Sequence, residues 1–558
     1  MKARSLLKFP AGGTRKNTFY LITITGLAGL TYQATTPANP NNSPFSNDLV
    51  EKIRAGVNGV ARSSLAVYTL TSNVVDYKYS LHGLNLDSDE YRSKLSEVHL
   101  RSARRVLKLC EANKGFYVKA GQFIAAMRQV PKEYSSTLSS LQNKAVPCNF
   151  EAIKKVLTSN LGKDLSEVFL SFDEEPIAAA SIAQVHRGIL KDHQNVAVKV
   201  QYPGLEQQMR IDITTMSFLS KSIAWVFPEY RFDWMVLEFE KAISSELDFA
   251  QEAKNSERIS KNFKGNSIVK IPHVFWDLTR RQVLTMQFCS GNKVDDLKFL
   301  KKCEIDPGKV AKALVEVFAE MIFVHGFLHG DPHPGNIIVS PGGRNGFSLV
   351  LLDHGICREL DEQFRLNYCE LWNALILLDA NKIADLGERF GVGKYARYFP
   401  VIFTGRTIDS KSALGRGMTL EEKKILKQEL KALNMEDISS FMESLPPDFI
   451  TILRTDGLLR SVISKLGASQ QIRLLTYAKY SVYGLSSKLN PLSGVTEKNF
   501  FSSFKATVGF IRLRLVLEVL YLLSWIQDLG RSFLSRIRKI LAEAIHLLTR
   551  VSSPAVLM

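Results

Sequence analysis

The first 47 residues of the 558-residue chain contain no acidic residue. The basic residues of this segment are Lys2, Arg4, Lys8, Arg15 and Lys16. A basic, acid-free start with scattered Ser and Thr is typical of organellar import segments. An uncharged stretch, Asn17 to Ala34, comes next and is near the lower length limit for a bilayer-spanning helix. We interpret residues 1–47 as a targeting segment with a hydrophobic anchor; a secretory signal peptide and a disordered tail are the alternatives.

Paired cysteines are also lacking. The six cysteines include no C-x-x-C pair, so the chain needs no disulfide framework and has no zinc-finger spacing. It also lacks an RNP-like aromatic motif and any Lys/Arg tract of five to eight residues, so we expect no nucleic-acid partner. The net charge of +17 favours contact with another anionic surface, and we expect this to be a phospholipid membrane surface.

Phosphate-binding glycine motifs are absent too. No G-x-x-x-x-G-K-[ST] occurs, which excludes a P-loop NTPase. Short β-rich runs are expected at Val168–Phe172, Ile182–Ile189 and Val196–Val200, with a strand pair at Val274–Thr279 and Gln282–Phe288. The rest of the chain is mostly helical in pattern, and after Leu360 almost entirely so.

The strongest motif that is present is HGDPHPGN, residues 329–336, between an apolar helix and a short strand. Phosphoryl transfer needs a carboxylate near the attacking hydroxyl and oxygen ligands for Mg²⁺. Kinase catalytic loops supply both as H-R-D-x-x-x-x-N, and His329, Asp331 and Asn336 keep that spacing, with Gly330 in place of Arg. We expect Asp331 to act as the base or to orient water, and Asn336 to bind metal.

A second metal ligand is expected at the end of the next strand. Asp353-His354-Gly355 follows Leu349–Leu352 directly, in the place of the kinase D-F-G triplet. Asp353 is therefore the expected second Mg²⁺ ligand. Taken alone, either motif could be an ordinary turn, because Asp, Gly and Asn are turn formers. Their order and their position beside strands favour the catalytic interpretation.

A lysine for the ATP phosphates is expected upstream of these loops. Val196-Ala197-Val198-Lys199 resembles the V-A-I-K strand, although a Lys at a strand end is often only solvated. Strand alternation places Ala197 and Lys199 on one face and the three valines on the buried one. Lys199 should pair with a helical Glu. The helical stretch Phe239–Ile259 offers Glu246, Asp248 and Glu252, of which we choose Glu252.

The loop over the phosphates is rich in alanine where a Gly-rich loop is expected. It comprises Ala178, Ala179, Ala180 and Ser181. Alanine adopts positive φ at a cost of about 1 kcal/mol. We therefore expect a loop that is tighter than G-x-G-x-x-G or differently shaped. Met286 and Phe288 are the expected adenine contacts.

These residues together resemble the UbiB-type, or aarF-domain-containing, atypical kinase family. The resemblance covers about Leu95 to Gly467 and adds two signatures, K-x-G-Q at Lys119 to Gln122 and E-x-D at Glu246 to Asp248. The hydrophobic amino terminus and the long helical region after the kinase-like part look most like the mitochondrial member-one group. Gln287 departs from the family pattern, which commonly has an acid there.

The resemblance implies an α+β, protein-kinase-like two-lobed fold with an N-terminal helical extension and inserted helices. Lys119, Gly121 and Gln122 would lie on an element that occludes the protein-substrate groove, with Lys119 near Glu246 and Asp248. The implied domains are a targeting segment (1–47), a helical extension (48–160), an N-lobe (161–290), a C-lobe (291–500) and a membrane-associated helical end (501–558). We interpret Ile511–Ile526 in that end as a membrane-surface or helix-packing element, with a plain core helix as the alternative.

The implied activity is that of an Mg-ATP-dependent atypical kinase or ATPase of lipid or coenzyme Q homeostasis. Its partners would be ATP, Mg²⁺, a lipid or quinone-related small molecule and a membrane surface. The implied location is the mitochondrion, at the inner membrane, with a plastid as the alternative.

Three other functions compete with this one. A catalytically weak pseudokinase scaffold would bind nucleotide or lipid without chemistry. A metallohydrolase would use His325, His329, Asp331 and His333, although Pro332 and Pro334 break the helix that would align these residues. A small-molecule kinase of the aminoglycoside or choline type shares the H-G-D loop but not K-x-G-Q.

Overall fold

The computed structural model describes most of the chain after the predicted import segment. The described residues are 47–85, 88–126, 130–143, 147–226, 240, 243–343, 345–405, 407, 418–431, 441, 444–486 and scattered positions between 508 and 537. The predicted import segment and anchor therefore lie outside the described residues, apart from Asn47. Among the described residues, no helix has both the length and the apolar character needed to cross a membrane.

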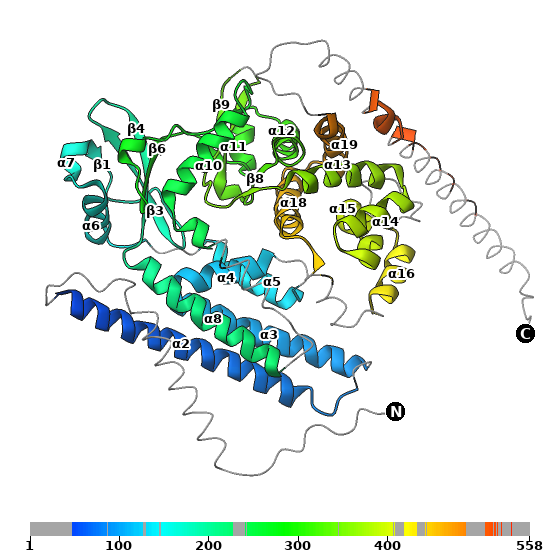
Figure 1. Ribbon diagram of the computed structural model, residues 1–558, viewed down its shortest axis with the longest axis horizontal. Helices are drawn as coiled ribbons and strands as arrows, with labels where there is room; N and C mark the ends of the chain where they lie inside the picture. The colour runs from blue at the N-terminus through cyan, green and yellow to red at the C-terminus, as the bar shows by residue number, and fades with distance from the viewer. Residues whose placement is uncertain are drawn as a thin grey trace, which may run out of the picture. The chain divides into compact units, whose positions relative to one another are not determined.

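The chain forms two compact units (Figure 1). The first unit comprises Met1–Arg258, Ile271–Cys289 and Asp353–Ile356. The second comprises Ile259–Lys270, Ser290–Leu352 and Cys357–Met558. The chain thus passes from the second unit to the first between Leu352 and Asp353.

The first unit combines a helical layer with an antiparallel sheet. Its helices are α2 (Asn47–Ser80), α3 (Asp89–Asn113), α4 (Gly115–Ala126), α5 (Lys132–Leu138), α6 (Phe150–Leu161), α7 (Leu165–Val168), α8 (Leu205–Val226) and α10 (Phe249–Asn262). The last turn of α10 belongs to the second unit. The first unit also has 3-10 turns at Ser139–Asn143 and Trp276–Leu278. Its strands are β1 (Phe169–Phe172), β2 (Ala178–Ala179), β3 (Ala183–Leu190), β4 (Asn195–Gln201) and β6 (Val283–Gln287).

The sheet has the order β1-β3-β4-β6, with β2 also paired to β3. In β4, Val196, Val198 and Val200 are completely buried and share a core with α6. Ala197 and Lys199 point to the other face, as the alternation predicts. That face is covered as well, because Phe249 and Ala253 of α10 are buried in a second core with residues of β3 and β6.

In the helical layer, α2 packs along α3 and α8, and α4 packs against α3, α5 and α8 (Figure 1). A buried ion pair joins α2 to α8, since Nε of Arg62 donates to Oδ1 of Asp212 at 3.0 Å. The Asp212 side chain is only 1 % exposed. Burial raises the pKa of Asp212 to about 6, although Arg62 acts in the opposite direction. A buried charge of this kind is tolerated only when it is paired.

The second unit is mostly helical and contains two small sheets. Its helices are α11 (Leu297–Lys302), α12 (Pro307–Ala319), a π-helical turn (Glu320–His325), α13 (Glu362–Leu377), α14 (Ala380–Arg389), α15 (Phe399–Thr404), α16 (Leu420–Lys431), α18 (Pro447–Lys465) and α19 (Gln470–Ser486), with 3-10 turns at Pro334–Asn336 and Gly393–Tyr398. Its strands are β5 (Val269–Lys270), β7 (Asn292–Lys293), β8 (Phe327–His329), β9 (Ile337–Pro341), β10 (Phe347–Leu351) and β11 (Cys357–Glu359).

Aromatic rings form the centre of the second unit. Phe323 stacks on Tyr368 with ring centroids 5.4 Å apart, and Trp372 meets Tyr477 edge to face at 4.9 Å. α12 and α13 pack against α19 around these rings. The π-helical turn ends at Gly326, whose φ of +61° is a conformation that favours glycine, and the chain turns there into β8. Strand β8 then leads directly into the HGDPHPGN motif.

Two expected elements are wrong. Only Val274 of the expected strand Val274–Thr279 pairs with β6, by an isolated bridge, and Trp276–Leu278 forms a 3-10 turn. The expected helical stretch Phe239–Ile259 is interrupted at Leu247 and Asp248. There the Asp248 side chain accepts hydrogen bonds from the backbone of Ala250 and Gln251 at 3.0 and 3.1 Å, so it caps α10 instead of lying within a helix.

Candidate functional site

Lys199 lies at the centre of a buried polar cluster in the first unit. Its Nζ is 2.9 Å from both carboxylate oxygens of Glu252 and 3.0 Å from Oδ1 of Asp353. It also lies 4.9 Å from the centroid of the Phe249 ring. Burial by itself would lower the pKa of Lys199, but the carboxylates of Asp353 and Glu252 outweigh it and raise that pKa. The lysine is therefore a charged ammonium at neutral pH.

Glu252 is the acid that pairs with this lysine, as the sequence predicts. It lies in the first turn of α10, where the helix dipole favours a carboxylate, and its side chain is 2 % exposed. Burial raises the pKa of Glu252 to about 7, with Lys199 acting in the opposite direction.

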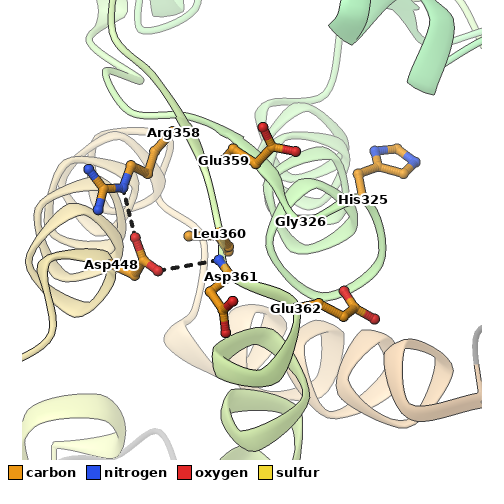
Figure 2. A pocket seen from close by; sticks show the side chains of 8 residues that line it. All are labelled: His325, Gly326, Arg358, Glu359, Leu360, Asp361, Glu362 and Asp448. Atoms are coloured by element: carbon orange, nitrogen blue, oxygen red, sulfur yellow. Dashed lines mark hydrogen bonds and ion pairs between the residues drawn. The ribbon is translucent and has the colours of Figure 1, made fainter.

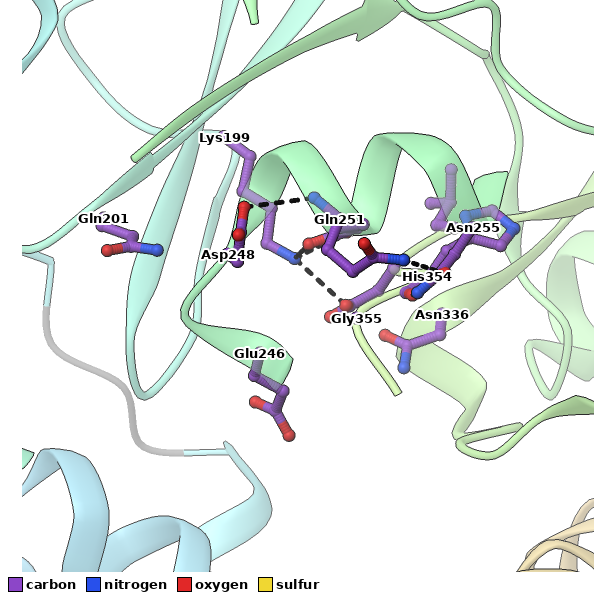
Figure 3. Close-up of polar contacts among 12 residues, drawn as sticks. Lys199, Gln201, Glu246, Asp248, Gln251, Asn255, Asn336, His354 and Gly355 are labelled. Carbon is purple, nitrogen blue, oxygen red and sulfur yellow. Dashed lines mark hydrogen bonds and ion pairs between the residues drawn. The ribbon is translucent and has the colours of Figure 1, made fainter. Parts of the chain in front are cut away.

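Asp353 has an unusual backbone conformation. Its φ is +54°, one of few positive values at non-glycine positions of the described chain. Its side chain is 39 % exposed, so one edge is open to solvent while Oδ1 contacts Lys199. A carboxylate at such a position has the chemistry of an Mg²⁺ ligand. Figure 3 shows Lys199 beside the polar residues of α10 and the backbone of His354 and Gly355.

The HGDPHPGN motif forms a loop in the second unit between β8 and β9. Nδ2 of Asn336 donates to the backbone oxygen of Asp331 at 3.2 Å and to its Oδ2 at 3.3 Å. The loop thus brings the predicted base and one predicted metal ligand together. Because the amide nitrogen of Asn336 is used on Asp331, its Oδ1 is the atom with the chemistry of a metal ligand.

His329 orders this loop. It is completely buried, its Nδ1 accepts from the N–H of Asp331 at 3.2 Å, and its Nε2 lies 3.0 Å from the carbonyl oxygen of Leu352. Since Nδ1 accepts, Nε2 carries the proton and donates. Neither nitrogen is then available to zinc. In the described part of the chain, no three His, Cys, Asp or Glu side chains gather as a metal site. The hydrogen bonds of His329 therefore argue against its use as a zinc ligand.

Helix α18 contributes two residues to the loop that the motif does not identify. Oγ1 of Thr455 lies 3.3 Å from the carbonyl oxygen of Gly330 and 2.9 Å from that of Thr451, so its single proton is shared between the two acceptors. Nη2 of Arg454 lies 3.6 Å from Oδ1 of Asp331. Gly330 stands where H-R-D loops have arginine, and here a guanidinium reaches the loop from α18. No sequence signal marks these residues, although they fall within Leu95 to Gly467, the range over which the sequence resembles the family.

The alanine-rich segment forms a tight hairpin, in agreement with the expected change of shape. Ala178 and Ala179 form β2, and the N–H of Ala180 donates to the carbonyl oxygen of Ala183 at 2.8 Å. None of Ala178, Ala179, Ala180 and Ser181 is among the residues with positive φ. The hydroxyl of Tyr202 donates to the carbonyl oxygen of Ala180 at 3.0 Å and braces the hairpin.

Met286 and Phe288, the expected adenine contacts, lie in β6 and just after it. Met286 is half-buried and pairs with Ala197 across the sheet. Phe288 donates its N–H to the carbonyl oxygen of Asn195 at 3.0 Å, and the Arg187 guanidinium lies 4.9 Å from the centroid of its ring. Both side chains therefore lie at one end of β4, the strand that carries Lys199.

The K-x-G-Q signature lies on α4. Nζ of Lys119 is 2.9 Å from Oε2 of Glu246, and Nε2 of Gln122 donates to the carbonyl oxygen of Leu141 at 3.0 Å. A Cβ on Gly121 would lie 3.1 Å from Sγ of Cys110 and would overlap the side chain of Leu141. The structure therefore brings Lys119 to the first acid of E-x-D, whereas the second, Asp248, is used to cap α10.

The second unit has an open hollow of about 550 Å³, drawn in Figure 2. Its lining residues are His325, Gly326, Arg358, Glu359, Leu360, Asp361, Glu362 and Asp448. At one side, Nε of Arg358 donates to Oδ1 of Asp448, the first-turn acid of α18, at 2.7 Å. None of the residues assigned to the kinase-like site lines the hollow. The hydrogen bond from Arg358 holds the start of α18.

Comparison with known proteins agrees with this architecture. The ABC1 atypical kinase-like domain family matches residues 140–387. The AarF domain-containing protein kinase 1 of Xenopus tropicalis is 39% identical over 413 residues, which covers 73% of this chain and 79% of that protein. The mouse protein of the same name is 35% identical over 480 residues, with 84% and 91% covered.

A solved Mycobacterium tuberculosis protein in complex with erythromycin aligns with a TM-score of 0.44 and 22% identity, over 69% of this chain and 96% of that one. The mixed α and β fold, the ordered motifs and the two relatives that match over most of their length agree with one another. The predicted family and fold class are thereby confirmed. The chain belongs to the ABC1, or AarF domain-containing, family of atypical kinase-like proteins.

Proposed function

We propose that the protein is an Mg-ATP-dependent atypical kinase or ATPase. The observation that carries the proposal is the position of Lys199 between the carboxylates of Glu252 and Asp353. A buried, charged lysine on a central strand is suited to the oxygens of a polyphosphate. Asp353, the second carboxylate that contacts Lys199, is also open to solvent. It is therefore suited to bind the cation that accompanies the phosphates.

Each remaining residue has a role in this proposal. Glu252 orients Lys199, which binds the α- and β-phosphates, and the hairpin of Ala178 to Ser181 supports them. Asp353 and Oδ1 of Asn336 hold Mg²⁺, which neutralises charge on the transferred phosphoryl group. Asp331 accepts the proton of an attacking hydroxyl or orients water. Lys119 and Glu246 limit access for a protein substrate.

The acceptor in this proposal is a lipid or quinone-related small molecule at a membrane surface. Two exposed faces support the membrane part. Among the exposed residues of α2 between Val57 and Tyr79, the only charged one is Lys78. The other charged residues of this part of α2 face its neighbouring helices, where Arg62 pairs with Asp212 and Asp76 pairs with two arginines of α3. Tyr68 is 70% exposed and Tyr79 85%.

The C-terminal segment supports the same interpretation. Its described positions are helical, and exposed apolar side chains recur every three or four residues at Val508, Ile511, Leu515, Val519, Leu522 and Ile526. Leu513, on the opposite side, is buried. A plain core helix would bury the first set, so the exposure of these side chains favours a surface element over a plain core helix. An exposed apolar stripe beside Arg512 and Arg514 fits an anionic membrane surface.

The membrane part can be tested by co-sedimentation with vesicles of phosphatidylcholine and cardiolipin. The double variant Tyr68→Glu/Val75→Glu places two charges on the uncharged face of α2 and should reduce binding about tenfold. Leu170→Glu changes an exposed apolar residue of the sheet and serves as the control. Equal binding of both variants and the wild type would argue against α2 as the membrane face.

The proposed location is the mitochondrion, at the inner membrane, with a plastid as the alternative. The acid-free basic segment before Asp48 supports it. Import of a reporter fused to residues 1–47 into isolated mitochondria tests this part. Retention of the reporter outside the organelle would contradict it.

The main test compares ATP turnover by the purified wild type and by Asp353→Asn. We expect turnover to fall at least about 100-fold in the variant, because a neutral amide holds Mg²⁺ poorly. Equal turnover would remove the assignment. Tight Mg-nucleotide binding without hydrolysis, even with lipid or quinone analogues, would favour the pseudokinase scaffold, which the closed Lys119–Glu246 pair and the tight alanine hairpin also support.

A further inference from the structure

The backbone around Asp353 is held by two side chains that no motif includes. Nδ2 of Asn255 donates to the carbonyl oxygen of His354 at 2.9 Å, and Oγ of Ser245 donates to that of Gly355 at 3.1 Å. A non-glycine residue at φ +54°, such as Asp353, persists only where its surroundings hold it in place. Hydrogen bonds to the next two carbonyl groups provide such a restraint.

Asn255 is better placed for this task than Ser245. It is 7% exposed and lies one helical turn after Glu252 on α10. Its amide is oriented by Gln251, whose Nε2 donates to Oδ1 of Asn255 at 3.0 Å. With Oδ1 occupied in this way, the Nδ2 group faces His354, as Figure 3 shows. The donor is therefore buried, oriented and directed at the backbone of the metal-binding triplet.

We propose that Asn255 is a positioning residue for the carboxylate of Asp353. It holds the His354 carbonyl so that Asp353 stays in its left-handed conformation and presents its carboxylate to Lys199 and to Mg²⁺. This inference rests on the proposed function, because it assumes that Asp353 binds the metal that accompanies ATP. Asn255 acts through Asp353 and does not itself touch nucleotide or metal.

The position of Asn255 also links two parts of the site. Glu252 and Asn255 lie three residues apart on one face of α10, so the same helix orients Lys199 through the first residue and Asp353 through the second. Any movement of α10 changes both contacts together. The phosphate-binding lysine and the metal-binding carboxylate are thus set by one rigid element.

The test is a calorimetric titration of the full chain with ATP, once with excess Mg²⁺ and once with EDTA. In Asn255→Asp, a carboxylate oxygen replaces the Nδ2 donor and repels the His354 carbonyl, while the side chain keeps its shape. We expect the gain in ATP affinity on adding Mg²⁺ to shrink about tenfold, as for other residues that orient metal ligands. ATP affinity in EDTA should change by less than about twofold.

Gln201→Glu is the matched control, because it also replaces an amide donor by a carboxylate oxygen that faces a backbone carbonyl. The Gln201 amide is buried like that of Asn255, and its Nε2 donates to a backbone carbonyl, that of Leu247, at 2.7 Å, but it does not contact the Asp353 triplet. A purely structural role of buried amides predicts equal effects of Gln201→Glu and Asn255→Asp. A positioning role predicts that only the second variant loses its response to Mg²⁺.

If Asn255→Asp does not fold, Ser245→Ala is the second variant for the same titration. It removes only the hydrogen bond to Gly355 and should reduce the response to Mg²⁺ in the same direction, about threefold. A normal response to Mg²⁺ in a folded Asn255→Asp variant would overturn the inference and leave the proposed function intact. Failure of the wild type to bind ATP would overturn the proposed function, and this inference with it.

Discussion

Nζ of Lys199 and Oδ1 of Asp353 lie 3.0 Å apart, so the proposed phosphate ligand and the proposed metal ligand neutralise each other. Mg²⁺ must therefore compete with the lysine for this carboxylate. Removal of the lysine should strengthen Mg²⁺ binding in the absence of nucleotide, by about fivefold, because an ion pair with a partly exposed carboxylate contributes about 1 kcal/mol. The same change should weaken ATP binding at least about tenfold.

The variant for this experiment is Lys199→Met/Glu252→Gln, because Lys199→Met alone would leave Glu252 buried without its counter-charge. Mn²⁺ titration followed by electron paramagnetic resonance measures the metal, and calorimetry measures ATP. Glu252→Gln alone is the control, and its Mn²⁺ affinity should stay close to that of the wild type. If the double variant bound Mn²⁺ no better than the wild type, the competition would not exist.

The ion pair between Lys119 and Glu246 should stabilise the contact of α4 with the E-x-D segment. The two side chains are 21% and 8% exposed, so the pair is largely shielded from solvent. Lys119→Met should cost about 2 kcal/mol, because it leaves a buried carboxylate. In Lys119→Met/Glu246→Gln, about 1 kcal/mol of this loss should be recovered. Urea unfolding of the wild type, the two single variants and the double variant measures the coupling energy of the pair. If the losses of the single variants add up to that of the double variant, the pair is not coupled.

The parts of the site that could be predicted are those where motif and strand end coincide. HGDPHPGN and Asp353-His354-Gly355 each follow a short strand, and strand ends present side chains at defined places. Lys199 was predictable for the same reason, since alternation along β4 separates it from the valines. The tight hairpin at Ala178 to Ser181 followed from the cost of positive φ at alanine.

The parts that could not be predicted depend on contacts between distant segments. Thr455 and Gly330 are 125 residues apart in sequence, and Asn255 and His354 are 99 apart. A single sequence has no periodicity or spacing that reports such a pair. The break before α10 was missed for a local reason: the Asp248 side chain bonds the next two backbone N–H groups and begins a new helix where the apolar pattern continues.

The helical extension should lose stability as the pH falls, because of His99. This residue lies between Tyr77 and Tyr134, with ring centroids 5.6 and 5.9 Å away, and hydrogen-bonds the Tyr77 hydroxyl. Burial lowers the pKa of His99, against a smaller opposing effect of Glu133. His99 therefore binds a proton more readily in the unfolded chain than in the folded one. The contribution of neutral His99 to the free energy of unfolding is fully present above pH 6.5 and is lost as the pH falls through that value.

Hydrogen exchange of α2, α3 and α5 at pH 7.5 and pH 5.5, corrected for intrinsic rates, measures this effect. The helices should open more often at pH 5.5 in the wild type, and His99→Gln should remove part of the difference. The buried ring of His186 and the half-buried ring of His333, whose pKa values burial also lowers, should still respond in the variant. An unchanged pH response in His99→Gln would assign the effect to those other histidines.

Helix α18 should affect turnover without affecting nucleotide binding, because Arg454 contacts Asp331, the proposed base. A guanidinium 3.6 Å from the proposed base orients its carboxylate, and the loss of such a partly shielded contact costs about 1 to 2 kcal/mol, or about 5- to 30-fold in turnover. Arg454→Gln should therefore lower kcat within this range and leave the Kd for Mg-ATP within about twofold. Arg454→Lys keeps the charge and should recover part of the loss. Thr455→Val, which removes the hydrogen bond to Gly330 at nearly constant volume, should lower kcat in the same way. A parallel loss of Mg-ATP affinity in all three variants would mean that α18 supports the fold as a whole and not the catalytic loop.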